Sequence, residues 1–194
     1  MKKIIPYDYR LPNLESLSLD QKIAQILTHA IFPKQSFDTG RPNKVEQFIH
    51  QYGIGSVHLA YGTLQQTQDW IDHLQELAMD KAGIPILFAA DCEQGVPHSF
   101  SVGTELPWQM AIGSTGNPEL ARKAGMVVGT EARAIGIDIV YGPVADVNSN
   151  PKNKLIMTRC FGANPETVSE FVRAYVDGLQ SAGVIAALKH FPGH

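Results

Sequence analysis

Polar residues stand at the ends of the apolar runs in this chain. A lysine that directly follows a buried run is costly unless it meets a partner, because its ammonium group offers three donors and no acceptor. Lys189 and His190 are in that position, after the run Val184–Leu188. A carboxylate or the hydroxyl groups of a sugar would satisfy Lys189, and His190 beside it is a candidate site residue. The other polar run ends are Tyr61–Gly62, Asp91–Glu93 and Gly142–Asp146.

Acidic residues follow two of these runs. Asp91 and Glu93 come directly after the run 84–90, where an acid serves turn chemistry as readily as function. We expect at most one of the two to face a ligand, and Asp91 is the candidate. Asp146 lies in an Asn-rich loop, where acidic side chains mostly bond their own backbone, so we expect Asp146 to be structural.

Arg159 is the single cation of a largely uncharged segment, 155–163. The planar fork of a guanidinium suits a carboxylate or a pair of hydroxyl groups. The position of Arg159 leaves two interpretations open, a salt bridge, for example with Asp146, and a ligand contact.

Composition excludes several classes of protein. The chain has 194 residues, a net charge of −3 and no block of like charges, so it carries neither a nucleic-acid footprint nor a polybasic membrane patch. A neutral small molecule or a carbohydrate fits better as a partner. A phosphate-binding glycine loop, a GxSxG elbow and a CxxC or Cys/His spacing are all missing, so neither a nucleotide cofactor nor a metal is expected.

The beginning of the chain has basic residues but lacks the apolar stretch of a signal peptide, and no apolar run is long enough to span a bilayer. We therefore expect a cytoplasmic protein without a membrane partner. Cys92 and Cys160 are isolated in the sequence, which is compatible with a reducing compartment.

The elements that position these groups are indicated by capping residues and apolar runs. Ser18 and Gln21 form a capping box before a first helix, and a second helix ends at Gly53. The run Ile54–Tyr61 is the first expected strand. Further helices are predicted over 63–82, 117–136 and 164–183, each followed by an apolar strand.

Continuous apolar strands separated by helices are typical of parallel strands buried on both faces, so the predicted class is α/β. About four strands are expected, in the order βαβαβαβ. Two architectures share this order at this length: an open doubly wound sheet, and half of an eight-stranded (β/α) barrel. Both place ligand sites at the carboxyl ends of the strands, where the polar groups of this chain stand.

Five sequence blocks resemble, in order and spacing, the N-terminal domain of glycoside hydrolase family 3. The last block is similar to the β-N-acetylhexosaminidase branch, since the β-glucosidase branch usually differs after Lys-His-Phe. The resemblance makes residues 1–16 an N-terminal extension and residues 17–194 the N-terminal portion of the barrel domain. The blocks are Asp91–Gly95, Glu105–Trp108, Gly136–Asp138 with Gly142–Val147, Thr158–Gly162 and Lys189–His194.

The resemblance implies a TIM-type (β/α) barrel, of which this chain holds the first half. It also implies a retaining β-glycosidase that hydrolyses O-glycosyl bonds through a glycosyl-enzyme, without a metal or an organic cofactor. The expected substrate carries a terminal β-linked N-acetylglucosamine. By motif, the residues that would hold the sugar hydroxyl groups are Asp91, Arg159, Lys189 and His190.

The chain departs from the family pattern in one block and stops short of the catalytic residues. The hexosaminidase branch usually has Glu-Gly-Gly and then an arginine, whereas this chain has Glu93, Gln94 and Gly95, and His98 is expected in the space of that arginine. In that branch the acid/base histidine and the nucleophilic aspartate follow the Lys-His-Phe-Pro-Gly-His block. Both would fall past residue 194, so we expect this segment alone to be inactive.

Three alternatives remain. The first is a β-glucosidase or β-xylosidase of the same family. The second is a non-catalytic sugar-binding protein that keeps the four sugar-binding residues. The third, an open-sheet nucleotide-binding domain, is disfavoured because the chain has no phosphate-binding loop.

Overall fold

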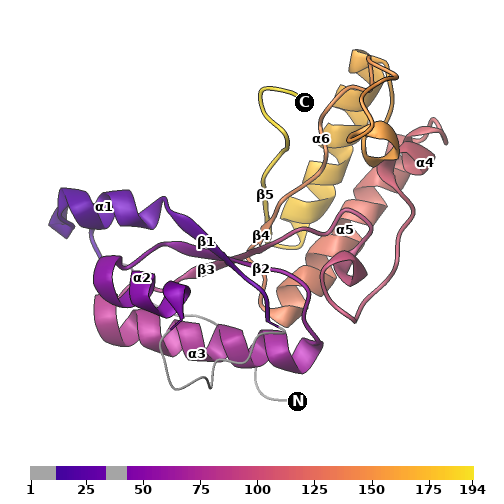
Figure 1. Ribbon diagram of the computed structural model, residues 1–194. Helices are drawn as coiled ribbons and strands as arrows, with labels where there is room; N and C mark the ends of the chain where they lie inside the picture. Colours follow the sequence, from indigo (N-terminus) through magenta and orange to yellow (C-terminus); the bar gives the residue numbers. More distant parts are fainter. Residues whose placement is uncertain (1–11, 34–42) are drawn as a thin grey trace. The chain divides into compact units, whose positions relative to one another are not determined.

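The computed structural model describes residues 12–33 and 43–194. The chain divides into two compact units, Met1–Ala89 and Ala90–His194, and each is described by itself. Most of the expected N-terminal extension lies outside the described residues. Figure 1 shows the elements of both units in chain order.

The first unit is built from parallel strands with helices between them. Strand β1 pairs with β2 in the register Thr28↔Ser56, and β2 pairs with β3 in the register Ser56↔Leu87. Helices α2 and α3 lie on the same side of these strands (Figure 1). The elements are η1 (Leu14–Ser16), α1 (Leu19–Gln25), β1 (Thr28–Ile31), α2 (Lys44–Tyr52), β2 (Ser56–Leu59), α3 (Leu64–Ala82) and β3 (Leu87–Ala90).

The core of the first unit follows from the apolar periodicity of its helices. Trp70 and Leu74 on α3 are buried, as are Val57 on β2 and Phe88 on β3. Ser18 and Gln21 form the expected capping box of α1, and Gly53 ends α2 with the left-handed backbone that glycine adopts readily.

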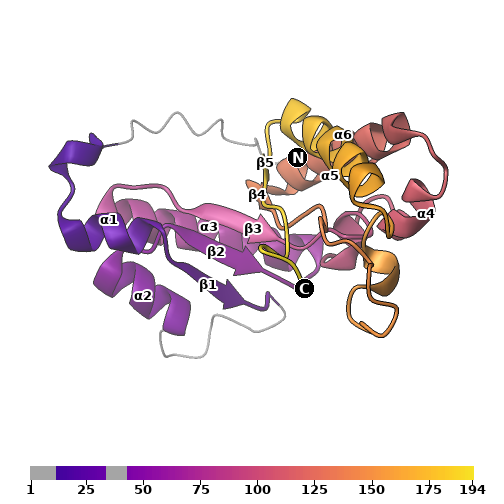
Figure 2. The ribbon, with the colours of Figure 1, turned by 90° about the horizontal axis from the view of Figure 1, so that it is seen from above.

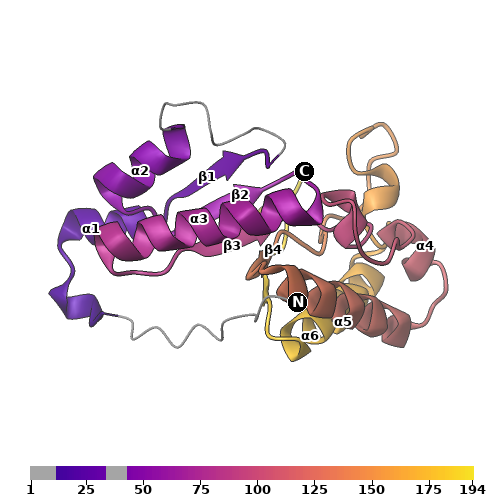
Figure 3. The ribbon, with the colours of Figure 1, turned by 90° about the horizontal axis from the view of Figure 1, so that it is seen from below.

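The second unit contains the predicted polar groups. Strand β4 pairs with β5 in the parallel register Ile139↔Ile185. Helices α5 and α6 lie side by side, as Figures 2 and 3 both show. The elements are η2 (Val96–His98), α4 (Gln109–Gly113), α5 (Pro118–Ile135), β4 (Ile139–Val140), η3 (Met157–Arg159), α6 (Pro165–Ser181) and β5 (Ile185–Ala186).

Two glycines allow α5 and α6 to pack at close range. A Cβ atom on Gly178 would lie 2.1 Å from the carbonyl oxygen of Arg122, and one on Gly125 would lie 2.2 Å from that of Tyr175. Neither position therefore accepts a side chain without moving backbone. This contact fixes α6, which leads directly into β5 and the Lys189–His190 pair.

The strand ends of the second unit meet at one edge. The Tyr141 N–H donates to the carbonyl of Ala90, the last residue of β3, at 2.9 Å, and the Ala145 N–H donates to the carbonyl of Lys189 at 2.7 Å. Because these bonds bring the segments after β3, β4 and β5 side by side, their polar residues share one site.

The predicted helices and the α/β class are confirmed, and the structure adds one strand to the four runs expected to form strands. The described residues contain five strands. The segment Thr28–Ile31 forms β1 ahead of the run that was expected to be the first strand. Its four residues carry the burial order exposed, intermediate, exposed and buried, which is too weak a pattern to identify a strand. Helix α4 was also not predicted, and Ala182 rather than Gly183 caps α6.

No helix among residues 12–33 and 43–194 combines the length and the apolar character needed to cross a membrane.

Candidate functional site

The second unit contains a cavity of about 540 Å³ whose wall includes all four predicted site residues. We call it the charged cavity. Its charged lining consists of Asp91, Glu93, Arg159 and Lys189. The rest of its wall includes His190, His98, Trp108, Tyr141 and Leu188.

Lys189 lies between the two carboxylates that follow β3. Its Nζ forms an ion pair with Asp91 and lies 2.7 Å from Glu93 Oε1. The Lys189 side chain is 16% exposed, so the ammonium group is largely desolvated and held by these partners. The partner that the sequence predicted for this lysine is thus supplied by the protein itself.

Arg159 makes a bidentate pair with Glu93. Its Nε donates to Oε2 at 2.8 Å and its Nη2 donates to Oε1 at 2.7 Å. Burial would raise the pKa of Glu93, but the hydrogen bonds from Arg159 and Lys189 outweigh burial and hold that pKa below its ordinary value. The same hydrogen bond raises the pKa of Arg159. Glu93 is therefore an ionised anchor shared by the two cations.

His190 is oriented by Asp146. The Asp146 Oδ2 atom lies 2.7 Å from His190 Nδ1 and also accepts from the backbone N–H of His190 at 3.1 Å. Because an ionised carboxylate is an acceptor only, Nδ1 carries the hydrogen, and in the neutral imidazole with that tautomer Nε2 is the acceptor. Arg159 Nη2 lies 3.4 Å from that Nε2. In this tautomer the Nε2 lone pair faces Arg159 Nη2 in the wall of the charged cavity.

Asp146 also holds the last residue of the chain. The backbone N–H of His194 donates to Asp146 Oδ1 at 2.9 Å, and the Asp146 side chain is 2% exposed. The expectation that Asp146 bonds its own loop was wrong, since its carboxylate contacts the backbone N–H of His190, the His190 ring and the backbone N–H of His194. Arg159 forms a salt bridge, and its partner is Glu93 rather than Asp146. Its contact with a ligand stays a prediction.

Glu93 is the residue that sequence reasoning missed. Only one of Asp91 and Glu93 was expected to face the site, yet both contact Lys189. The signal was available in the spacing, because residues two apart in an extended segment point to the same side.

The arrangement suits a neutral ligand rich in hydroxyl groups. Asp91 is partly exposed and offers acceptors, Lys189 offers donors, and His190 Nε2 offers one acceptor more. A cysteine nucleophile is excluded at Cys92, where burial raises the pKa of the thiol to about 12. Among the described residues, no three His, Cys, Asp or Glu side chains are grouped to hold a metal ion.

The ionised Glu93 carboxylate predicts a specific dependence of the free energy of unfolding on pH. Because the folded-state pKa of Glu93 lies below its ordinary value of 4.5, Glu93 stabilises the fold at neutral pH, and this contribution is lost as pH falls through the folded pKa. Glu93→Gln is expected to lower the free energy of unfolding by about 3 kcal/mol near neutral pH, since Arg159 loses its ionised partner and Lys189 loses one of its two. The difference from wild type should shrink below pH 4.5.

Urea unfolding of both proteins across this pH range measures the difference. Glu170→Gln, at an exposed position of α6, is the matched control and should leave stability unchanged. A Glu93→Gln effect that stays constant from neutral to acidic pH would contradict the role given to the ionised carboxylate.

Comparison with known proteins places the chain in a family. Residues 18–194 match the model of the "Glycosyl hydrolase family 3 N terminal domain". The chain is 31% identical over 180 residues to a beta-N-acetylglucosaminidase/beta-glucosidase of Cellulomonas fimi, covering 93% of this chain and 30% of that protein. It is 33% identical over 180 residues to the beta-hexosaminidase LpqI of Mycobacterium tuberculosis, covering 92% and 44%.

A solved structure agrees with these relatives. The glycoside hydrolase family 3 beta-N-acetylglucosaminidase of Paenibacillus sp. str. FPU-7 superimposes with a TM-score of 0.81 at 31% identity, covering 92% of this chain and 34% of that one. The chain thus spans less than half the length of these proteins. The likeness selects the barrel-type α/β fold over the open sheet. The chain belongs to glycoside hydrolase family 3, as part of its N-terminal domain.

Proposed function

We propose that this chain is the sugar-binding part of a retaining β-glycosidase, a β-N-acetylhexosaminidase that releases terminal β-linked N-acetylglucosamine. The observation that carries the proposal is the convergence of Asp91, Arg159, Lys189 and His190 on one cavity in a domain of this family. Two relatives that are named for the release of N-acetylglucosamine or N-acetylhexosamine, those of Cellulomonas fimi and Mycobacterium tuberculosis, support the substrate class.

The charged cavity would act by holding the hydroxyl groups of the terminal sugar. Asp91 accepts from a hydroxyl group, Lys189 donates to one, and His190 Nε2 accepts from another. Such charge-assisted bonds stabilise the transition state when they shorten as the ring distorts, so they contribute to kcat as well as to affinity.

The charge balance of the site also suits the reaction. Glycosidic cleavage passes through an oxocarbenium-like state with positive charge on the sugar. Arg159 and Lys189 are paired with the carboxylates of Asp91 and Glu93, and a third carboxylate, Asp146, lies behind His190. A surplus of negative charge, fixed before the sugar arrives, favours the charge that develops during the reaction.

The nucleophile and the general acid/base are proposed to lie outside this chain. The pairings of Glu93 and Asp146 support this, because both carboxylates are buried and committed to protein partners. A retaining enzyme needs a nucleophile and a general acid/base that are both free to act on the glycosidic bond. Relatives more than twice as long as the matched segment have room for them.

An activity assay tests the proposal. The protein encoded by the complete gene is assayed on an aryl N-acetyl-β-glucosaminide and on the matching aryl β-glucoside, beside residues 1–194 alone. We expect turnover of the N-acetyl substrate by the complete protein and none by residues 1–194. Turnover by residues 1–194 would overturn the proposal that the catalytic pair lies outside this chain. Inactivity of the complete protein on both substrates would overturn the proposal that it is a glycosidase.

A β-glucosidase of the same family is the second candidate. Two observations favour it: the Cellulomonas relative is named for both activities, and His98 lines the cavity where an arginine was expected. The His98 ring lies edge-on to Trp108, with centroids 6.3 Å apart. The ratio of kcat/KM on the two aryl glycosides decides between the candidates, since the proposed hexosaminidase must favour the N-acetyl substrate.

A further inference from the structure

Gln109 is a buried polar side chain that lies outside the charged cavity. It is 2% exposed and stands on α4 directly after Trp108, and among the described residues it does not line that cavity. Its Oε1 atom accepts a hydrogen bond from the backbone N–H of Val144 at 3.0 Å. Because a buried polar group without a partner is costly, this bond accounts for an amide side chain at this point of the core.

The Gln109 amide does for Val144 what a neighbouring strand does elsewhere in the sheet. Three residues earlier, the Tyr141 N–H donates to the backbone carbonyl of Ala90, at the end of β3. At Val144 the acceptor is the side-chain carbonyl of Gln109 instead. An amide side chain can take this place because it carries the same C=O group as the backbone. Gln109 thus continues the pairing of the segment that follows β4.

Val144 is the residue at which this segment meets the one that carries the site. It forms a parallel bridge with Lys189. The Lys189 N–H donates to the Pro143 carbonyl at 3.3 Å, and the Ala145 N–H donates to the Lys189 carbonyl at 2.7 Å. Because the two backbones are bonded on both sides of the bridge, a shift of Val144 moves Lys189, and with it His190, the next residue.

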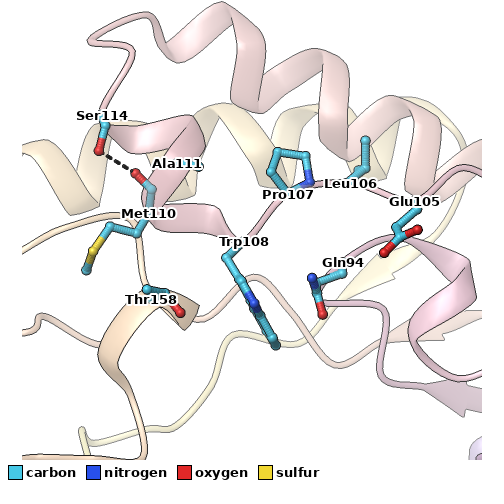
Figure 4. A pocket seen from close by; sticks show the side chains of 9 residues that line it. All are labelled: Gln94, Glu105, Leu106, Pro107, Trp108, Met110, Ala111, Ser114 and Thr158. Carbon is cyan, nitrogen blue, oxygen red and sulfur yellow. Dashed lines mark hydrogen bonds between the residues drawn. The ribbon is translucent and has the colours of Figure 1, made fainter.

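Met110, the next residue of α4, reaches the segment that carries Arg159. Met110 packs against a cluster of three buried side chains, Val144, Ile156 and Cys160. The Arg159 N–H donates to the Ile156 carbonyl at 2.8 Å. Figure 4 shows Met110 and Thr158, the residue before Arg159, in the wall of one pocket. Helix α4 therefore supports the backbone behind both cations of the site.

Helix α4 is fixed at both ends. At its last residue, a Cβ atom on Gly113 would lie 1.9 Å from the carbonyl oxygen of Phe161, so the two backbones are in close contact. Before its first residue, the Leu106 N–H donates to the Gln94 carbonyl at 2.9 Å. A side chain on an element held in this way positions its partner more precisely than one on a loop does.

We propose that Gln109 is a positioning residue of the charged cavity, which places Lys189 for the sugar by holding the backbone of Val144. The inference rests on the proposed function and deepens it, because it names a buried residue outside the cavity that sets the geometry of the sugar-binding groups. Gln109 acts through its acceptor oxygen. A side chain of similar length without an acceptor leaves the Val144 N–H unpaired, and the backbone then moves toward another partner.

Gln109→Met tests the proposal in the protein encoded by the complete gene, because methionine keeps the length of the side chain and removes the acceptor. Gln109→Asn, whose amide is one methylene too short to reach, is the second variant if Gln109→Met does not fold. Gln109→Glu keeps an acceptor oxygen whether or not its carboxyl group is ionised. Ile112→Val is the matched control, since it alters another buried residue of α4 and leaves the bond to Val144 in place.

The variants are assayed on the aryl glycoside that the wild type prefers, and circular dichroism measures their folded fraction. Gln109→Met is expected to lower kcat/KM by about tenfold and to raise KM, since misplaced binding groups hold the sugar less well. KM is the readout that a purely structural role does not move, because an unfolded fraction lowers the apparent kcat and leaves the KM of the folded fraction unchanged. Gln109→Glu should keep kcat/KM within about threefold of wild type, since it retains the acceptor.

Three results would overturn the positioning role. The first is an unchanged KM in the folded Gln109→Met or Gln109→Asn protein. The second is an equal rise of KM in Ile112→Val, which should keep the wild-type value. The third is a folded Gln109→Glu protein that is as impaired as Gln109→Met.

The two proposals fail in distinguishable ways. A wild-type KM in the Gln109 variants of an active glycosidase overturns the positioning role and not the proposed function. Inactivity of the complete protein on both aryl glycosides overturns the proposed function, and isothermal titration with N-acetylglucosamine and glucose then tests the positioning role. A sugar Kd that rises in Gln109→Met and not in Ile112→Val supports the role, and an equal Kd overturns it. Binding of neither sugar by the wild type overturns both proposals.

Discussion

Lys189→Ala is expected to lower kcat/KM of the protein encoded by the complete gene, on the aryl N-acetyl-β-glucosaminide, by about a thousandfold. Removing one preorganised hydrogen-bond donor to a transition state costs about 10²–10³ in kcat, and the loss of sugar binding adds to this in kcat/KM. Lys189 is the donor that lies between Asp91 and Glu93. Without it the two carboxylates face each other and a sugar hydroxyl group loses its charged partner.

Lys123→Ala is the matched control, since Lys123 is exposed on α5 and does not line the charged cavity. It should retain wild-type kinetics. Circular dichroism and thermal melting of both variants separate loss of the site from loss of the fold. A folded Lys189→Ala protein with kcat/KM within a few-fold of wild type would show that the charged cavity does not hold the reacting sugar.

Asp146→Asn is expected to lower kcat/KM about a hundredfold by changing the tautomer of His190, an effect of the size seen for partners that orient imidazole ligands. An amide can donate to Nδ1, whereas the carboxylate only accepts from it. In the variant Nε2 then carries the hydrogen, loses its acceptor role and turns an N–H toward Arg159 Nη2, 3.4 Å away.

A spectroscopic readout distinguishes this positioning role from a purely structural one. The ¹⁵N shifts of the His190 ring are expected to show hydrogen on Nδ1 in the wild type and on Nε2 in Asp146→Asn. Asp177→Asn, at an exposed position of α6, is the control for the substitution itself. An unchanged His190 tautomer together with a large loss of activity would show that Asp146 acts through the loop it holds and not through the ring.

Local signals predicted most of the fold because they are carried by neighbours in sequence. The capping boxes of Ser18 and Thr63 and the left-handed glycines Gly53 and Gly83 mark helix ends without any tertiary contact. Strand β1 was missed because it has a single buried residue, Ile31, so its identity depends on pairing with β2. That pairing is a long-range contact which no window of sequence contains.

The sequence predicted which residues form the site, but it did not predict which of them pair with one another. The four predicted residues stand at strand ends or in blocks that resemble the family, and the structure brings them to one cavity: Asp91, Arg159, Lys189 and His190. Which carboxylate pairs with which cation depends on contacts between side chains from the ends of three different strands, which are far apart in the sequence. Glu93 takes Arg159, and Asp146 takes His190, because Glu93 is buried between both cations and Asp146 lies under the 190–194 loop.

The central claim, that the charged cavity holds the terminal sugar, is tested most directly by a crystal structure of the protein encoded by the complete gene with N-acetylglucosamine bound. The claim predicts sugar hydroxyl groups within hydrogen-bonding distance of the Asp91 carboxylate, Lys189 Nζ and His190 Nε2. A sugar bound elsewhere, with these three groups still paired only to protein, would contradict it.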